Sequence, residues 1–450
     1  MPVRLYRDRA DELGPARHRH EEKAGWRTPD LDGGTAAGLL FLAAAAVALW
    51  LSTIYGLDGT NAAQRQDLLE FHLPTIRFFS TSPLSEAVMD YYAAPFPLFY
   101  IVFGALHSAM PGTAVLHAAS AILALGVIVT ACLILRQRRV SPTATAAVIL
   151  TILISPYFRG TAVFANTDVM PVLFFLLTIL LLDTQAGGSP SRMIAGVRVR
   201  DLLILAFAFL AFHARQFYAF LPVAAALLLL VEGGPQRRAA VIIASIVFAV
   251  PALYLVVLWG GPTPLSFQAS HARAGALPAT LLAVLANFGF YALAPAVATL
   301  VFYRREFLTT IRTRRFLVLF SGLAAVVVPA CLLAKSADLG GGGMVLKALD
   351  MAVPWPTPRA IVLGACALAA GGYALYLTLQ SPLRNLSLPL FLAALLPTST
   401  IFQRYFDPIL FLILLSIGTR ETRELLKTRL VFLFPGLEML VSFAGIAFYR

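Results

Sequence analysis

Long apolar runs separated by short polar segments repeat along the whole chain. The first run, Thr35 to Tyr55, carries no charged residue and is long enough for an α-helix to cross about 30 Å of hydrocarbon. Similar runs follow it and predict an all-α polytopic membrane protein with about thirteen transmembrane helices. The expected spans lie near residues 35–55, 114–135, 141–156, 168–184, 201–214, 217–232, 239–259, 279–302, 316–334, 359–380, 386–400, 408–419 and 430–448.

Lys and Arg gather in alternate loops, for example RQRR at 136–139, PQRR at 235–238 and TRETRELLKTR at 419–429. Basic loops remain on the cytoplasmic side of a membrane, so the N-terminus is expected inside and the C-terminus outside. Residues 1–34 are then a cytoplasmic polar tail, disordered or lying on the membrane surface. Residues 35–450 form a single transmembrane domain.

The first loop on the outside, residues 56–112, is the longest by this topology. Its last part, PFPLFYIVFGALHSAMPG (95–112), is apolar but short and rich in proline. If this segment were a span, the basic RQRR loop would be outside. We therefore expect interfacial or re-entrant helices within the loop.

The composition agrees with a membrane protein, because the mean hydropathy is +0.79 and only 13% of residues are charged. Soluble domains carry roughly a quarter charged residues. The net charge of +12 follows from the inside loops and predicts no nucleic-acid partner. The three cysteines lie in apolar runs, which predicts neither a disulfide framework nor a metal site.

Polar residues other than the basic loop markers fall almost entirely on the expected outer face. They are Asp67, Glu70, His72, Asp90, Asn166, Asp168, Arg215, Gln216, His271, Lys335, Asp338, Arg404, Tyr405 and Asp407. Charges near a bilayer are retained mainly where they serve a cavity or a substrate, so this convergence indicates a functional site. Single residues also have structural interpretations, since Asp168 suits a helix N-cap and Arg404 suits contact with lipid headgroups.

The stretch RQDLLEFHLPTIRFFS (65–80) concentrates several of these groups. Asp67 and Glu70 share a helix face, which could be either a solvated face or a reactive one, while His72 lies about 140° away from Asp67. Pro74 disfavours a regular helix through this point. We expect a kink near Phe71 and His72 that brings the imidazole back toward the carboxylates.

These motifs together resemble the GT-C superfamily, polytopic glycosyltransferases that use polyprenyl-phosphate sugars. The order of FHLP (71–74), an acidic residue before the fourth span (Asp168), an outer RQ pair (215–216), GG…SH (260–271) and RYF (404–406) carries the resemblance. Within the superfamily the chain is similar to the dolichyl-phosphoglucose-dependent α-1,2-glucosyltransferases. That family has an adjacent Asp-Glu pair before FHLP, which this chain lacks, so Asp67 and Glu70 both remain candidates for the catalytic carboxylate.

The resemblance implies a GT-C-type helix bundle that transfers a hexose from a polyprenyl-phosphate sugar to an acceptor hydroxyl on the outer (periplasmic or lumenal) face. Asp67, or else Glu70, would be the base of an inverting displacement. The expected residues for the donor phosphate and substrate are His72, Asp168, Arg215, Gln216, His271, Lys335, Arg404 and Tyr405. Arg215 and Arg404 are the expected phosphate clamps.

The expected partners are the lipid-linked donor, a glycan or lipid-linked acceptor and membrane lipids. No cofactor is expected, and the lack of a DxD motif predicts no metal requirement. The composition, rich in Ala, Arg and Pro, favours a bacterial inner membrane over the endoplasmic reticulum. A transporter or lipid-carrier flippase is the alternative function, and a non-catalytic membrane scaffold is a third; the transporter class would place ionisable groups near the middle of the membrane.

Overall fold

The computed structural model describes most of the chain after the N-terminal tail. The described residues are 33–57, 62–185, 193–194, 197–271, 277–334, 343–381, 384–397, 405–407, 409–416 and 420–448. The expected tail of residues 1–34 therefore lies almost wholly outside the described residues.

Nearly all described residues are helical. The helices of the first half are α2 (Gly33–Ile54), α3 (Ala62–Asp67), η4 (Leu68–His72), α4 (Leu73–Thr81), α5 (Leu84–Ala87), α6 (Leu98–Ala109), α7 (Thr113–Gln137), α8 (Pro142–Ile154), α9 (Pro156–Val163), α10 (Val169–Gln185), α11 (Val199–Ala214), η5 (Gln216–Ala219) and α12 (Phe220–Glu232). The only strands among the described residues are β1 (Met193–Ile194) and β2 (Val197–Arg198), which pair antiparallel.

The second half continues the bundle. Its helices are α13 (Pro235–Trp259), α14 (Leu265–His271), α15 (Leu277–Tyr291), α16 (Leu293–Phe302), α17 (Arg304–Ile311), α18 (Arg314–Ala334), α19 (Gly343–Ala352), α20 (Pro356–Gln380), η6 (Arg384–Leu386), α21 (Ser387–Ala394), α22 (Ile409–Ser416), α23 (Arg420–Lys427), η8 (Arg429–Phe432) and α24 (Leu433–Phe448). Each expected span thus contains a described helix, although several of these helices are shorter than the span or divide it.

Fewer helices than expected are long enough to cross a membrane alone. Among the described residues, six pass by length and composition, namely α2, α7, α13, α18, α20 and the segment Arg429–Ile446. Two bent pairs, α8 with α9 (64°) and α15 with α16 (56°), raise the number to eight. The expected spans 386–400 and 408–419 correspond instead to the eight-residue helices α21 and α22. Ile409–Leu415 of α22 is buried throughout, so protein rather than lipid surrounds this helix.

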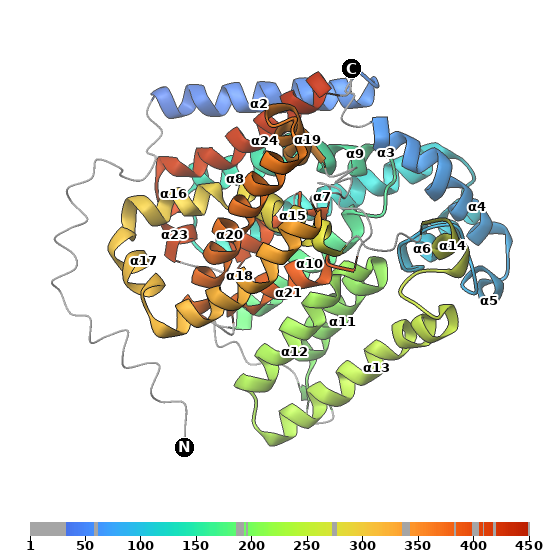
Figure 1. The fold of residues 1–450 in the computed structure, drawn as a ribbon. Helices are drawn as coiled ribbons and strands as arrows, with labels where there is room; N and C mark the ends of the chain where they lie inside the picture. Colours follow the sequence, from blue (N-terminus) through green and yellow to red (C-terminus); the bar gives the residue numbers. More distant parts are fainter. Residues whose placement is uncertain are drawn as a thin grey trace.

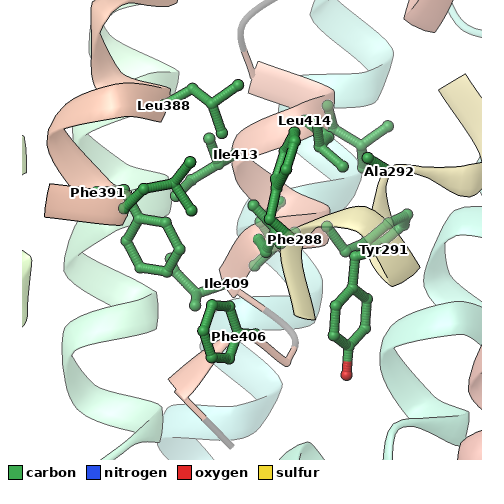
Figure 2. Close-up of a cluster of buried hydrophobic side chains, with 14 of the residues drawn as sticks. Phe288, Tyr291, Ala292, Leu388, Phe391, Phe406, Ile409, Ile413 and Leu414 are labelled. Atoms are coloured by element: carbon green, nitrogen blue, oxygen red, sulfur yellow. The ribbon is translucent and has the colours of Figure 1, made fainter. Parts of the chain in front are cut away.

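The main hydrophobic core lies between α7, α8, α10–α12, α15, α20–α22 and their neighbours. Figure 2 shows part of it, where Phe288 of α15 and Ala292, between α15 and α16, lie near Ile413 and Leu414 of α22. Phe406, immediately before α22, is fully buried in the same cluster and contacts Phe391 of α21 edge-on. This packing anchors the short segment 405–407 that precedes α22.

The first-loop helices build a second, aromatic core with the end of α13. In Figure 1 they gather at one side of the molecule, together with α14. Helix α6 has 12 residues, too few to cross a bilayer alone, and packs against α4. A side chain at Gly104 of α6 would meet the Phe79 Cβ at 2.7 Å, so glycine permits this close packing.

Helix α2 lies across one end of the bundle, near α24 (Figure 1). It packs on α8 through a small third core that includes Leu42, Leu49 and Ile154. The Trp50 indole Nε1 donates to the Leu153 carbonyl at 2.9 Å. Helix α8 ends at Ser155, whose hydroxyl accepts from the Phe158 amide at 3.1 Å and so starts α9 in a new direction. The bend between α8 and α9 places α9 at the site described next.

Candidate active site

Three of the expected site residues meet although they come from distant parts of the sequence. Arg215, which follows α11, forms an ion pair with Asp168, which precedes α10. Its Nη1 also donates to the Thr167 hydroxyl at 2.9 Å. The guanidinium carbon lies 4.7 Å from the ring centroid of Phe217 and 5.1 Å from that of Tyr405. Arg215 is therefore held between a carboxylate and two aromatic faces, an arrangement that favours a cation.

Local backbone features aim these side chains. The backbone of Arg215 is extended (φ −158°, ψ 127°), so the helical conformation is interrupted between α11 and η5. This is the position where we expected the turn between two spans. Ala165 has φ +46°, an uncommon conformation for a residue other than glycine, and creates the turn before α10. The Asn166 side chain accepts from the Thr167 amide at 2.8 Å and supports this turn. Asp168 thereby points its Oδ1 at Arg215.

A narrow pocket opens beside the Asp168–Arg215 pair. Its lining residues are Tyr157, Phe158, Thr161, Asp168, Val169, Val172, Phe217, Tyr218, Asp407 and Ile409. Two carboxylates and four aromatic side chains thus line the pocket, together with one threonine and three aliphatic residues. One oxygen of Asp168, Oδ2, is buried and has no hydrogen-bond partner among the described residues. Buried polar atoms are rarely left unpaired, so such an atom at a pocket marks a place where a ligand can bind.

Asp407 lies on the same pocket and only 2% of its surface is exposed. The side chains of Ser155 and Glu438 form hydrogen bonds with this carboxyl group. Burial raises the pKa of this carboxyl to about 7, and the facing Ser155, Glu438 and Arg159 oppose that rise only in part. Asp407 was expected on the outer face, and the anchored Phe406 next to it explains why its position is well defined.

Helix α3, which carries Asp67, contacts α9 beside this pocket. The Gln64 side-chain amide donates to the carbonyl of Tyr157, a pocket residue, at 3.4 Å. Asp67 is half-buried and is three residues after Gln64, so both share one face of α3. Glu70 is exposed and accepts from the Gln66 side chain at 2.9 Å. Of the two candidate bases, Asp67 is the one on the helix face that contacts the pocket wall.

The His72 ring lies against aromatic side chains of α6. Residues Leu68–His72 form a π-helical turn. The regular helix is therefore interrupted where we expected a kink, but the interruption is a wider helical turn. The His72 ring is buried, with its Nδ1 2.8 Å from the Tyr100 hydroxyl and its edge near Phe99. The imidazole is thus packed into the aromatic core of the first-loop helices.

The remaining expected residues are placed as follows. The Gln216 side chain donates to the carbonyls of Ala94 and Pro262 and so joins the first loop to the turn after α13. His271 is the last residue of α14, but its side chain lies outside the described part, as do Lys335 and Arg404 altogether. Among the described residues, no group of three His, Cys, Asp or Glu side chains is arranged to hold a metal ion.

Sequence reasoning missed two charged residues beneath the pocket, Arg159 of α9 and Glu438 of α24. Both are buried, and the Arg159 guanidinium donates to the Thr53 hydroxyl at 3.2 Å and to the Ile154 carbonyl. It also reaches the Ser442 hydroxyl of α24 at 3.4 Å. We expected almost no charge inside the spans, and Glu438 corrects that expectation. A lone carboxylate within the apolar run LFPGLEMLV was the signal that could have found it.

Comparisons with known proteins identify no family for the chain. No protein-family profile matches it, and no curated protein matches it. Among solved structures, the chain is similar to the crystal structure of ArnT from Cupriavidus metallidurans in the apo state, with 16% identity and a TM-score of 0.34. The match covers 92% of this chain and 78% of that one. A similarity of this size identifies neither a family nor an activity, so the function must be argued from the site.

Proposed function

We propose that this multi-pass membrane protein is a glycosyltransferase of GT-C type, which moves a hexose from a polyprenyl-phosphate sugar to an acceptor hydroxyl. The observation that carries the proposal is the meeting of Asp168, Arg215 and Tyr405 beside one pocket. All three were singled out from the sequence as outer-face residues. The narrower relation to dolichyl-phosphoglucose-dependent α-1,2-glucosyltransferases remains a prediction.

The reaction needs a base for the acceptor and a cation for the departing phosphate. We assign Asp67 as the base and Glu70 as the second candidate. Only Asp67 shares a helix face with Gln64, which contacts the pocket residue Tyr157. The acceptor oxygen attacks the anomeric carbon as the bond to phosphate oxygen breaks, and the acceptor proton passes to the carboxylate. One displacement of this kind inverts the anomeric centre.

Arg215 is the proposed phosphate clamp. Its planar guanidinium suits bidentate contact with phosphate oxygens, and the Asp168 carboxylate and two rings hold it in place before the donor arrives. Arg404, Lys335, His271 and Gln216 are proposed to bind the same phosphate or the sugar. His72, bonded to Tyr100, would act by holding η4 beside the pocket.

The donor would be embedded in the membrane and the acceptor would be a glycan or lipid-linked molecule on the outer face. We propose a bacterial inner membrane as the location, with the N-terminus in the cytoplasm. The distribution of basic loops supports the cytoplasmic N-terminus. Helix α10 has the pocket at its first end and the Arg138–Asp183 pair at its last end, so the pocket is on the side away from the basic loop at 136–139.

The decisive experiment incubates the purified protein with a panel of polyprenyl-phosphate sugars and a native lipid extract. Free polyprenyl phosphate and a glycosylated lipid product should form together. Asp67→Asn should reduce turnover at least about 1000-fold while donor binding is retained. Glu86→Gln, which alters an exposed carboxylate of α5, is the matched control and should remain active. Absence of turnover with every donor, or full activity of Asp67→Asn, would refute the assignment.

A flippase or transporter remains the second candidate, because the buried Arg159 and Glu438 are charges inside the bundle of the kind that such proteins use. It predicts movement of an intact lipid-linked sugar across proteoliposomes without cleavage of the sugar–phosphate bond. Following a doubly labelled donor, with separate labels on sugar and lipid, distinguishes transfer from transport in one assay.

A further inference from the structure

A group of exposed arginines lies between α16 and α18, where the proposed chemistry does not use them. Residues 303–315 read YRREFLTTIRTRR and contain one acidic residue. The exposed arginines of this segment are Arg304, Arg305, Arg312, Arg314 and Arg315. Within the described residues, none of these five guanidinium groups is paired with a carboxylate. Their positive charge is therefore available to a partner outside the protein.

The acidic residues around this segment are already engaged. Glu306 of α17 lies 2.7 Å from the guanidinium of Arg420 in α23. In α23 itself, Glu421 is buried and accepts from the Tyr376 hydroxyl at 2.8 Å. Glu424 accepts from a lysine of the same helix at 3.1 Å. The surface made by α17 and the start of α18 therefore keeps a net positive charge.

Helix α17 presents two of the arginines on its outward face. On its other side Phe307 and Ile311, four residues apart, pack against the main core, and the Phe307 ring meets a tyrosine of α20 edge-on at 5.0 Å. Arg305 and Arg312 are seven residues apart, so they share one helix face and lie about 10 Å apart along its axis. Thr309 is exposed between them. The two arginines thus project from a helix that is docked on the bundle.

The start of α18 indicates how deep this surface lies in a membrane. Helix α18 is long and apolar enough to span a membrane from Arg314 onward. Leu317 and Val318, about one helical turn later, are 51% and 63% exposed and would meet lipid tails. Figure 1 shows α17 at the edge of the molecule where α2 begins, running crosswise to α2. The arginines are therefore at the level of the lipid phosphates, along the surface of the membrane.

We propose that α17 and the start of α18 form a binding surface for anionic lipid headgroups, with Arg305 and Arg312 contacting phosphate. A planar guanidinium suits phosphate because it donates two parallel hydrogen bonds, and basic clusters beside membrane spans attract anionic lipids. On the proposed topology this surface is cytoplasmic. The proposal does not depend on the glycosyltransferase reaction.

Thermal unfolding of the purified protein in a neutral detergent tests the proposal. Phosphatidylglycerol should raise the midpoint by about 3 °C or more beyond phosphatidylcholine at the same mole fraction, because a ligand of the folded state stabilises it. Raising NaCl from about 0.1 to 0.5 M should at least halve this difference. Inorganic phosphate at the same concentration should give no shift. An equal shift with phosphatidylcholine or with inorganic phosphate would overturn the proposal.

Variants distinguish a specific surface from general positive charge. Arg305→Gln/Arg312→Gln should remove about half or more of the phosphatidylglycerol effect, and such exposed substitutions should leave the lipid-free midpoint nearly unchanged. The matched control is Arg136→Gln/Arg139→Gln, which removes two exposed arginines from another basic loop and should keep the wild-type shift. Equal losses in the two double variants would assign the effect to overall charge and refute the site.

A single substitution gives an independent check. Thr309→Glu places a negative charge between Arg305 and Arg312 without removing either, so it should also weaken the phosphatidylglycerol effect by about half. A full phosphatidylglycerol shift in both α17 variants would overturn the proposal.

Discussion

Helix α10 has an Asp–Arg pair at each end, and the two pairs differ in how completely they are satisfied. At one end Arg138 holds Asp183 with two bonds, from Nε at 2.6 Å and from Nη2 at 3.0 Å. Arg138 also donates to the Leu415 carbonyl at 2.6 Å and so caps the end of α22. At the other end Arg215 bonds one oxygen of Asp168, and the second oxygen has no partner among the described residues.

The difference separates a structural pair from a candidate binding pair. The Arg138–Asp183 pair uses its hydrogen-bonding capacity to join α7, α10 and α22. The Arg215–Asp168 pair is more buried, lies on a pocket and keeps an acceptor unused. The same two residue types therefore serve packing at one end of the helix and, in our proposal, ligand binding at the other. Mutations at the two ends can test this directly.

The largest expected effect is on activity. Arg215→Ala should lower turnover of the lipid-linked donor about 100-fold or more, because the developing phosphate charge loses its cation. Arg138→Ala should leave the turnover per folded molecule within about 2-fold of wild type. Initial rates, normalised to the monodisperse fraction, measure both. Equal losses in the two variants would abolish the distinction between the pairs.

The next effect is on stability and should have the opposite ranking. Arg138→Ala breaks a bidentate pair and uncaps α22, so it should lower the free energy of unfolding by about 2 kcal/mol. The pair is about a quarter exposed, which keeps the loss below that of a fully buried pair. Thermal denaturation in detergent detects the change as a shift of several degrees. A midpoint equal to that of wild type would contradict the structural role.

A smaller effect is expected when the carboxylates themselves are neutralised. Asp168→Asn keeps the shape of the site but loosens Arg215, so the KM for the donor should rise about 10-fold with a smaller change in kcat. Asp183→Asn is the matched change at the other end and should alter neither constant. Initial rates of both variants are measured over the same range of donor concentrations. A change in KM confined to Asp183→Asn would reverse our assignment.

The smallest effect concerns pH and compares Asp407 with Asp201, which Arg237 holds with bonds of 2.6 and 2.8 Å. Burial raises the pKa of Asp407 from its ordinary value of 3.8 to about 7, so the folded state binds more protons between these values. Stability contributed by this proton is present at pH 4 and lost as the pH rises through 7. The thermal midpoint should therefore fall by a few degrees between pH 5 and pH 8.

Two variants check the source of that pH dependence. Asp407→Asn should flatten it and raise the midpoint at pH 8, because the carboxylate at position 407 then no longer has to be buried as an anion. Asp201→Asn should lower the midpoint by a similar amount at both pH values, since it removes an ion-paired carboxylate elsewhere. The same slope in Asp407→Asn and wild type would assign the titration to another group.

Much of the helical organisation was predictable. The apolar runs of the sequence located every expected span on a helix, because hydrophobic length is a local property of the chain. The number of independent crossings was not predictable in this way. Whether the run at 408–419 meets lipid or protein depends on α15 and α21, which surround α22 (Figure 2).

The candidate site was predictable in part. Asp168, Arg215 and Tyr405 stood out as polar residues on one face, and in the fold they touch. His72 stood out equally, yet it turns into an aromatic core, because the π-helical turn Leu68–His72 changes its direction. Arg159 and Glu438 escaped notice, since only the packing of α9 against α24 makes them neighbours of Asp407.

The sequence by itself determined the membrane class and the approximate positions of the helices. These properties follow from hydrophobicity and charge along the chain, which need no knowledge of long-range contacts. Only the tertiary structure decided which carboxylates are satisfied and which are not. That distinction depends on hydrogen bonds of particular length and direction between segments far apart in sequence. It separates Asp183, both of whose oxygens accept bonds from Arg138, from Asp168, whose Oδ2 has no hydrogen-bond partner among the described residues.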